Sequence, residues 1–190
     1  MTATLTATPL STPIAAPGRH DRALPLRSQA ERLSVTYRAA RPMDVPAIAA
    51  LINDYAARGV MLPKSLDAIA LSLDDFIVAA DQTDRLLGCA AIREYSPSVA
   101  EVGSVAVVPR AHGTGIGREL VGRVEHLARC RGVNHLVALT LTPRFFEALG
   151  YAVVERSQFP EKLARDCAGC ARRMDCPEIC VSRYLDRHRN

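Results

Sequence analysis

Three glycines at alternate positions, Gly113, Gly115 and Gly117, follow an apolar strand predicted at 105–108. They form a turn that opens an amphipathic helix predicted at 115–131. In such a turn, successive backbone N–H groups point into one concavity, and the helix dipole adds partial positive charge there. The glycines also lack the Cβ atoms that would hold a diphosphate away from the backbone. This order of strand, glycine-rich turn and helix therefore predicts an anion-binding site.

Two other phosphate-binding folds place glycines between a strand and a helix. A dinucleotide-binding fold requires Gly-x-Gly-x-x-Gly in an early βαβ unit and an acidic residue about 20 residues later. Here the turn reads Arg-x-x-Gly-x-Gly-x-Gly and falls late in the chain. A nucleoside triphosphate loop needs Gly-Lys-Ser/Thr, which this turn lacks. A tight turn without a ligand stays as the alternative, although Arg110 and Arg118 can add charge-assisted bonds to a phosphate.

The remaining hydrophobic pattern predicts strands and helices in the order β-α-α-β-β-β-α-β-α-β. A first helix opens at Arg41 and ends before Gly59, and Ser65 caps a second helix. This order indicates a mixed sheet with helices packed on it, in the α/β (α+β) class. The other predicted elements are strands at 35–38, 76–80, 86–95, 101–108, 135–141 and 151–154, and helices at 65–73, 115–131 and 143–149.

Composition excludes several classes of protein. The chain has 190 residues, of which 48% are hydrophobic, enough for one domain with a core. No apolar run approaches the ~18 residues of a membrane span. The net charge of +4 falls short of a dedicated nucleic-acid binder. A modest positive excess suits an enzyme that handles anionic small molecules, and ordinary variation in surface charge explains it equally.

Residues 1–34 are rich in Thr, Ala, Pro and Ser and lack apolar periodicity, so we expect a disordered tail before a domain at 35–185. The N-terminus has no basic region followed by an apolar stretch, so we do not expect a secretory signal. An organelle transit peptide is an alternative for this Ser/Thr-rich, acid-poor segment, although its first arginine is Arg19. We expect a cytoplasmic protein.

The motif Arg110-x-x-Gly113-x-Gly115 resembles the acyl-CoA signature of the GNAT acetyltransferases, and the element order resembles that family's fold over residues 35–185. The resemblance implies the GNAT acyl-CoA N-acyltransferase fold and acetyl-CoA as cosubstrate. It also implies that the backbone of Val105 and Val107 pairs with the pantetheine arm. The turn would then hold the pyrophosphate through Arg110, Gly113, Thr114, Gly115, Gly117 and Arg118.

Four further segments, 59–65, 88–91, 100–102 and 145–151, are similar to bacterial N-acetylglutamate synthases, in particular to the short form without an amino-acid-kinase domain. That resemblance implies acetyl transfer to the α-amino group of L-glutamate or glutamine, the first step of arginine biosynthesis. The partners would then be a small amino acid and acetyl-CoA, with neither a nucleic acid nor a membrane. A homodimer is one assembly that we consider.

Glutamate has two carboxylates, so its pocket needs at least two cations. Lys64, in the loop before the second helix, and Arg93, on the strand predicted at 86–95, are the candidates, and each could equally be a solvated surface cation. At the Lys64 position the family usually has Arg, whose bidentate fork Lys lacks. The resemblance places Cys89 beside the substrate, whereas its residue type is typical of a core position.

Acetyl transfer requires a neutral amine. Glu101, at the start of the strand that flanks the CoA site, is the candidate general base, acting through water; a solvated carboxylate at a strand end is the alternative. Backbone N–H groups near Val105 would stabilise the oxyanion. We expect direct transfer in a ternary complex, because Cys89 has no recognisable His partner for covalent catalysis. Many GNAT enzymes protonate the thiolate with a Tyr at the position where this chain has Phe146.

The spacing Cys167-x2-Cys170-x5-Cys176-x3-Cys180 has the density of a structural zinc site, because four thiolates satisfy tetrahedral zinc. Free or redox-active thiols are the alternative. Cys180 also fits an alternating strand at 179–184 and could belong to the core, which would leave three cysteines and another ligand.

Two other functions stay open at this point. The first is a CoA-binding sensor or zinc interaction module without catalysis. The second is a GNAT enzyme that acetylates a peptide, a protein lysine or an aminoglycoside. Those cationic substrates need acidic pockets, whereas the loops here offer Lys64 and Arg93.

Overall fold

The computed structural model describes residues 34–185, so the predicted tail at 1–34 lies, except for Ser34, outside the described residues. The strands are β1 Thr36–Ala39, β2 Phe76–Ala80, β3 Leu86–Glu94, β4 Val99–Val107, β5 His135–Thr140, β6 Ala152–Val153 and β7 Ile179–Tyr184. The helices are α1 Val45–Ala57, α2 Leu66–Leu71, α3 Ile116–Cys130, α4 Pro143–Glu147 and α5 Pro160–Lys162.

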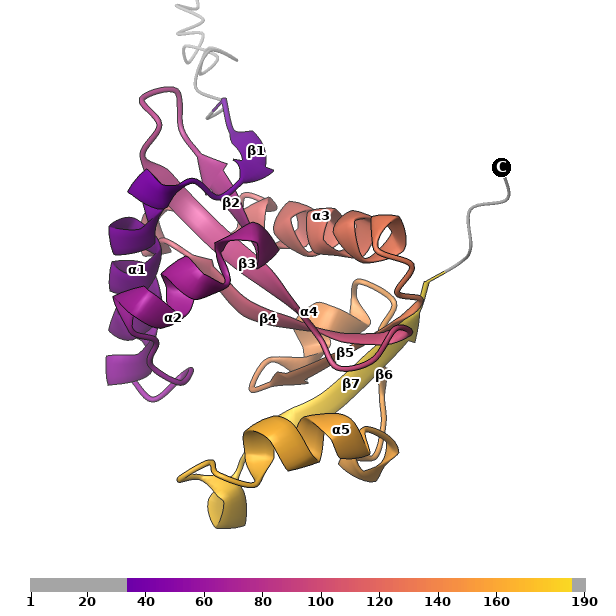
Figure 1. The fold of residues 1–190 in the computed structure, drawn as a ribbon. Helices are drawn as coiled ribbons and strands as arrows, with labels where there is room; N and C mark the ends of the chain where they lie inside the picture. The colour runs from indigo at the N-terminus through magenta and orange to yellow at the C-terminus, as the bar shows by residue number, and fades with distance from the viewer. Residues whose placement is uncertain (1–33, 186–190) are drawn as a thin grey trace, which may run out of the picture. The chain divides into compact units, whose positions relative to one another are not determined.

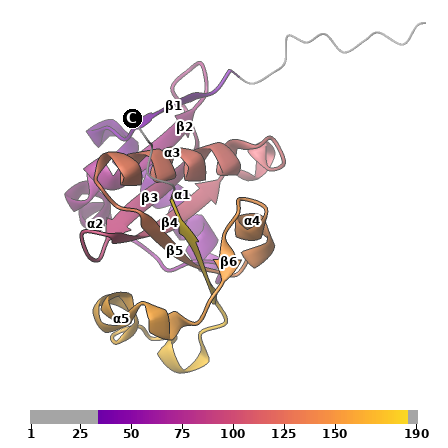
Figure 2. The same cartoon turned by 90° about the vertical axis from the view of Figure 1, so that its right-hand side faces the viewer.

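A mixed seven-stranded sheet forms the centre of the domain, in the order β1-β2-β3-β4-β5-β7-β6. Only β4 and β5 run parallel; the other neighbouring pairs of this sheet are antiparallel. Figures 1 and 2 show α3 on one side of the sheet and α1 with α2 on the other. The predicted element order and the mixed sheet are confirmed.

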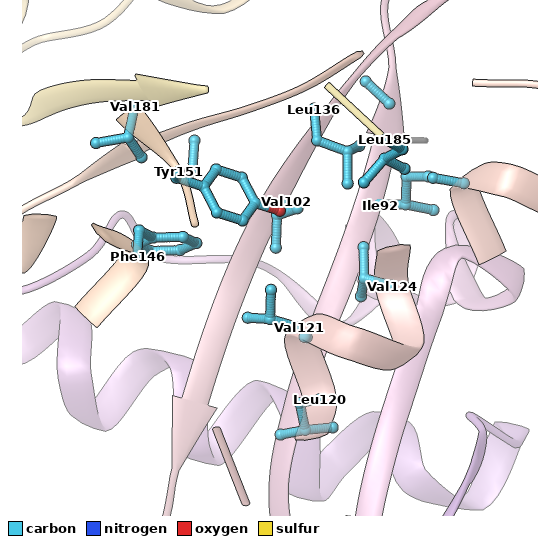
Figure 3. Close-up of a cluster of buried hydrophobic side chains, with 14 of the residues drawn as sticks. Ile92, Val102, Leu120, Val121, Val124, Leu136, Phe146, Tyr151, Val181 and Leu185 are labelled. Atoms are coloured by element: carbon cyan, nitrogen blue, oxygen red, sulfur yellow. The ribbon is translucent and has the colours of Figure 1, made fainter. Parts of the chain in front are cut away.

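The face beneath α3 carries the larger hydrophobic core. The apolar stripe of α3, including Leu120, Val121 and Val124, packs against Ile92 of β3 and Val102 of β4. Figure 3 shows these side chains together with others from β5, α4 and β7. Burial of this stripe is the main reason that α3 is held against the sheet, because helices gain most of their stability from packing an apolar face.

The opposite face is covered in two parts. Ile48 and Ile52 of α1 and Ile69 of α2 pack over β2, β3 and β4. The predicted cap of α2 is confirmed, since the Ser65 hydroxyl accepts a bond of 3.1 Å from the Ala68 N–H. Farther along the sheet, Phe159 just before α5 packs on β5 and β7.

Two local differences separate the structure from the predicted elements. A 3-10 turn at Pro42–Asp44 precedes α1, because the Asp44 carboxylate accepts from the Arg41 N–H and pairs with Arg38. The sequence pattern did not predict α5, which continues as a π-helical turn at Leu163–Cys167. Within residues 34–185, no helix has both the length and the apolar character that a membrane span requires.

Gly88 marks the place where β3 and β4 approach each other most closely against α3. A Cβ atom on Gly88 would lie 2.8 Å from the Ala106 carbonyl oxygen and 3.1 Å from Leu120 Cδ1. We expect Gly88→Ala to lower the free energy of unfolding by about 1–3 kcal/mol, because the backbone must shift to admit the methyl group. Urea denaturation measures this change.

Gly122→Ala is the matched control for this prediction. Gly122 lies on the exposed side of α3, and a Cβ atom there would meet nothing within 4 Å. This substitution should raise the free energy of unfolding by about 0.5–1 kcal/mol through helix propensity alone. Equal stability of Gly88→Ala and the wild type would contradict the close approach of β3 and β4.

Candidate active site

One edge of β4 is open over the second half of the strand. The parallel pairing of β4 with β5 covers residues 99–101 and ends at Glu101 opposite Val137, while β4 stays paired with β3 as far as Val107. The Val108 N–H donates to the Leu87 carbonyl, 2.8 Å away. Because backbone groups alternate along a strand, the N–H and C=O groups of Val105 and Val107 point away from β3. An extended chain could therefore pair with them.

A β-bulge bends β4 at the start of this open edge. Ser104 has a left-handed backbone with φ of 51°. The register shifts here, since Cys89 is opposite Ala106 while Ala91 is opposite Gly103. Bulges of this kind bend a strand and re-aim its groups, and this one accompanies the divergence of β4 from β5.

The predicted glycine-rich turn follows directly. Gly113 and Gly115 have φ values of 74° and 89°, in the left-handed region that favours glycine, and a Cβ atom at either position would point into open space. The Thr114 hydroxyl braces the turn by donating to the Ala111 carbonyl, 2.7 Å away. Helix α3 begins at Ile116, so the N–H groups of its first turn have no intrahelical acceptor. These N–H groups are the donors that an anion site of the predicted kind would use.

Two arginines flank this turn. Arg110 and Arg118 are exposed, and neither forms an ion pair within the described part of the chain. Gly117 is closer to protein atoms than the other two glycines, because a Cβ atom there would lie 3.5 Å from the Phe145 ring. The turn thus offers free backbone N–H groups and uncompensated positive charge together.

A small polar cluster joins α1 to the end of β4. The Tyr55 hydroxyl lies 2.6 Å from the Val107 carbonyl oxygen and 2.7 Å from His112 Nε2. His112 Nε2 in turn lies 2.9 Å from the same carbonyl oxygen. These contacts occupy the Val107 carbonyl oxygen, and they hold the turn against α1.

Glu101 lies where β4 and β5 begin to diverge, and it is well partnered. Lys162 Nζ is 2.7 Å from Glu101 Oε1, and the Tyr95 hydroxyl donates to Glu101 Oε2 at 2.6 Å. The Lys162 side chain is only 7% exposed, and that of Glu101 is 14% exposed. Glu101 is therefore a shielded carboxylate rather than a solvated strand end.

The same cluster extends to Arg93. Arg93 lies directly opposite Glu101 across β3 and β4, and it forms an ion pair of 2.7 Å with Asp166. The Tyr95 hydroxyl also contacts Asp166. Burial, followed by the Glu101 and Asp166 charges, raises the pKa of Tyr95 well above its usual range. Tyr95 therefore stays protonated and serves as a hydrogen-bond donor.

The structure places Lys64 in the loop before α2. Asn53 of α1 holds its backbone through two bonds, with the Lys64 carbonyl accepting at 2.9 Å and its N–H donating at 3.0 Å. The Lys64 side chain forms no ion pair within residues 34–185. The Gly59 carbonyl accepts from Arg172 at 2.9 Å, so the segment after α5 contacts this loop.

The resemblance placed Cys89 beside the substrate, but its side chain lies in the hydrophobic core. It is fully buried beneath α1, and its Sγ lies 3.5 Å from the Ser104 carbonyl oxygen. Burial raises the pKa of the Cys89 thiol to about 12. In this arrangement Cys89 is a core residue, and a neutral buried thiol is a poor nucleophile.

The C-terminal cysteines do not fit a zinc site as they are arranged. Among the described residues, no group of three or more His, Cys, Asp or Glu side chains is placed to hold a metal ion. Cys180 is buried in β7 among Val137 and Phe159, and Cys176 Sγ lies 3.6 Å from a Glu178 carboxylate oxygen. The predicted set of Cys167, Cys170, Cys176 and Cys180 is not gathered, because β7 commits Cys180 to the core.

Phe146 is 4% exposed, and its ring packs edge-on against Tyr151 with centroids 5.3 Å apart. It has no group that could protonate a leaving thiolate. The structure thus keeps Phe146 in the core under α3, as Figure 3 shows.

An open strand edge that runs into an anion-binding turn at a helix N-terminus is typical of acyl-CoA-dependent acyltransferases. Residues 49–151 match the Acetyltransferase (GNAT) family, and the chain belongs to that family. It is therefore an acyltransferase enzyme with the GNAT fold.

Relatives agree on the reaction class. An uncharacterized N-acetyltransferase of Chlorobaculum tepidum is 40% identical over 148 residues, which cover 78% of this chain and 95% of that protein. An amino-acid acetyltransferase of Mycobacterium tuberculosis is 33% identical over 62% of this chain and 68% of its own length.

One solved structure gives the match in three dimensions. N-acetylglutamate synthase from Neisseria gonorrhoeae, complexed with coenzyme A and N-acetyl-glutamate, superposes with a TM-score of 0.73 at 28% identity. The match covers 80% of this chain but only 35% of the Neisseria chain. This chain thus spans about a third of that protein.

Proposed function

We propose that this enzyme transfers the acetyl group of acetyl-CoA to the α-amino group of L-glutamate or glutamine, the first step of arginine biosynthesis. The observation that carries the proposal is the position of Glu101, at the point where the open edge of β4 begins. A thioester bound along that edge and an amine beside Glu101 would meet there.

The proposed coenzyme site uses backbone groups first. The pantetheine arm would pair with the N–H and C=O groups of Val105 and the N–H of Val107, which face the open side. The pyrophosphate would accept bonds from the N–H groups between Gly113 and Gly117, with Thr114, Arg110 and Arg118 at the rim. Oxygen-rich phosphates fit a turn whose N–H groups lack intrahelical partners.

The proposed chemistry is direct transfer. Glu101 would take a proton from the ammonium, through water, and the neutral amine would attack the thioester carbonyl carbon. The C–N bond forms, the C–S bond breaks, and backbone N–H groups near Val105 would stabilise the oxyanion. The attacking nitrogen would release its second proton to water as the tetrahedral intermediate collapses. With Phe146 unable to donate a proton, the thiolate would leave as an anion and take up a proton from solvent.

The acceptor class follows from charge. Lys64 and Arg165 have no ion-pair partner within the described residues, and Arg165 lies over the Tyr95 ring at 4.6 Å from its centroid. Arg93 is half exposed, lies opposite Glu101 on β3 and pairs with Asp166. Cations in this region support an acceptor with carboxylates over a cationic peptide, protein lysine or aminoglycoside.

Thiol release from acetyl-CoA against each amino acid in turn tests the proposal. We expect glutamate or glutamine to give the highest kcat/KM, and Lys64→Ala or Arg93→Ala to raise the KM for the amino acid while leaving that for acetyl-CoA unchanged. Lysine or a basic peptide as the best acceptor would contradict the proposal.

A further inference from the structure

Lys162 stands out among the charged residues, because it is the one buried lysine or arginine in residues 34–185. A buried charge is expensive unless it is paired, and a buried ion pair is weak evidence for stability. The ammonium reaches Glu101 at 2.7 Å, Tyr95 Oη at 3.3 Å and Asp166 at 3.8 Å. Its surroundings therefore indicate that Lys162 acts on the Glu101 carboxylate.

The cluster around Glu101 has more carboxylates than the tyrosine can serve. The Tyr95 hydroxyl contacts both Glu101 and Asp166, yet it has a single proton to donate. Each carboxylate is also stabilised by a cation: Arg93 pairs with Asp166, and Lys162 pairs with Glu101. The titratable or charged groups that face Glu101 or its partners are Arg93, Tyr95, Lys162, Arg165, Asp166, Cys167 and Cys180.

The fold fixes where Lys162 lies. Phe159, which is 2% exposed, anchors the start of α5 between Val137 and Cys180, and its carbonyl accepts from the Leu163 N–H at 3.1 Å. Lys162 is the last residue of α5, before the π-helical turn that carries Asp166. Both charges therefore reach the Glu101 cluster from one anchored segment. Figure 1 shows α5 below β7.

We infer that Lys162 is a positioning residue that keeps Glu101 ionised and fixed at the acceptor side of β4. This role rests on the proposed function, in which Glu101 accepts the proton of the amine. Without the ammonium, two carboxylates would share one hydroxyl donor in a shielded site, and burial together with like charge would favour protonation of Glu101. A protonated Glu101 cannot act as a base.

The test compares Lys162→Met, which keeps the shape and removes the charge, with Lys162→Arg, which keeps the charge. Protonation of Glu101 is followed by carbon-13 NMR of protein labelled in its glutamate carboxyl groups, with the Glu101 signal identified by its absence in Glu101→Gln. We expect the midpoint to move up in Lys162→Met, because an opposite charge in contact favours the ionised form. Lys162→Arg should leave it near the wild-type position.

Activity provides the second readout. In Lys162→Met the acidic limb of the kcat profile should move up in pH by the same amount, and kcat should fall about tenfold for each pH unit below the new midpoint, without a change in the KM for acetyl-CoA. Arg38→Met is the matched control, because it breaks another shielded ion pair, with Asp44, and should lower stability without moving the profile.

The outcomes separate the two claims. An unchanged Glu101 midpoint in Lys162→Met, or a loss of kcat that is equal at every pH, would show that Lys162 only attaches α5 and would overturn the inference. If the Glu101 midpoint shifted in Lys162→Met but the wild-type protein acetylated no amine, the proposed function would be contradicted and the electrostatic role of Lys162 would stand.

Discussion

Glu101→Gln is expected to lower kcat by about 100- to 1,000-fold while leaving the affinity for CoA unchanged. General-base catalysis contributes roughly that much, and the amide keeps the size of the side chain but cannot accept a proton. The shielded position of Glu101, between Lys162 and Tyr95, makes the carboxylate difficult to replace by solvent. Steady-state kinetics with acetyl-CoA and the preferred amino acid measure the change.

Glu94→Gln is the control for this variant. Glu94 is an exposed carboxylate of β3, opposite Ala100, and it pairs with Arg131 rather than with the Glu101 cluster. Its loss should leave kcat within the error of the assay. If Glu101→Gln kept a third or more of the wild-type kcat, Glu101 would not be the base.

Gly115→Ala is expected to raise the Kd for CoA by about tenfold or more. The residue has φ of 89°, which costs roughly 1–2 kcal/mol for a residue with a Cβ atom, and the new methyl group would stand in the N–H concavity. Apart from its chain neighbours, nothing in the described part of the protein lies within 4 Å of that methyl position, so the substitution creates no clash within the protein. Isothermal titration calorimetry measures the affinity.

The same helix supplies a matched control at its other end. Gly132, just after α3, has φ of 80°, and a Cβ atom there also meets nothing within 4 Å. Gly132→Ala should therefore lose a similar amount of stability through backbone strain without losing affinity for CoA. Equal affinities of the two variants would remove the turn at Gly113–Gly117 from the coenzyme site.

The parts of the fold that the sequence predicted have strong local signals. The period of α3 and the alternation of β7 are properties of the chain itself, and α3 begins within one residue of its predicted start. Gly113 and Gly115 could be placed in a turn because positive φ favours glycine. The prediction of an anion site rests on these local features.

Side-chain partners that come from distant segments could not be predicted. Tyr55 and His112 meet at the Val107 carbonyl across a sequence separation of 57 residues. Lys162 and Asp166 lie on a short helix and a π-helical turn, whose residues show no apolar period. The place of Glu101 at the start of the strand that flanks the predicted CoA site made it a candidate, but it carried no information about the ion pair that holds Glu101.

The cysteine spacing shows the opposite case. Density in sequence predicted a metal site, whereas tertiary structure places Cys180 in the core between β5 and β7. A strand directs alternate side chains to opposite faces, and in β7 the face that receives Cys180 is already filled by Val137 and Phe159. Local spacing alone could not decide between ligand and core.

An amide NMR titration of the wild-type protein with CoA tests the account most directly. The account predicts that the largest chemical-shift changes occur at the amides of Val105, Val107, Gly113, Gly115 and Gly117, because these groups would bind the pantetheine arm and the diphosphate. Saturable binding of CoA that left these amides unchanged, or no binding at all, would contradict it.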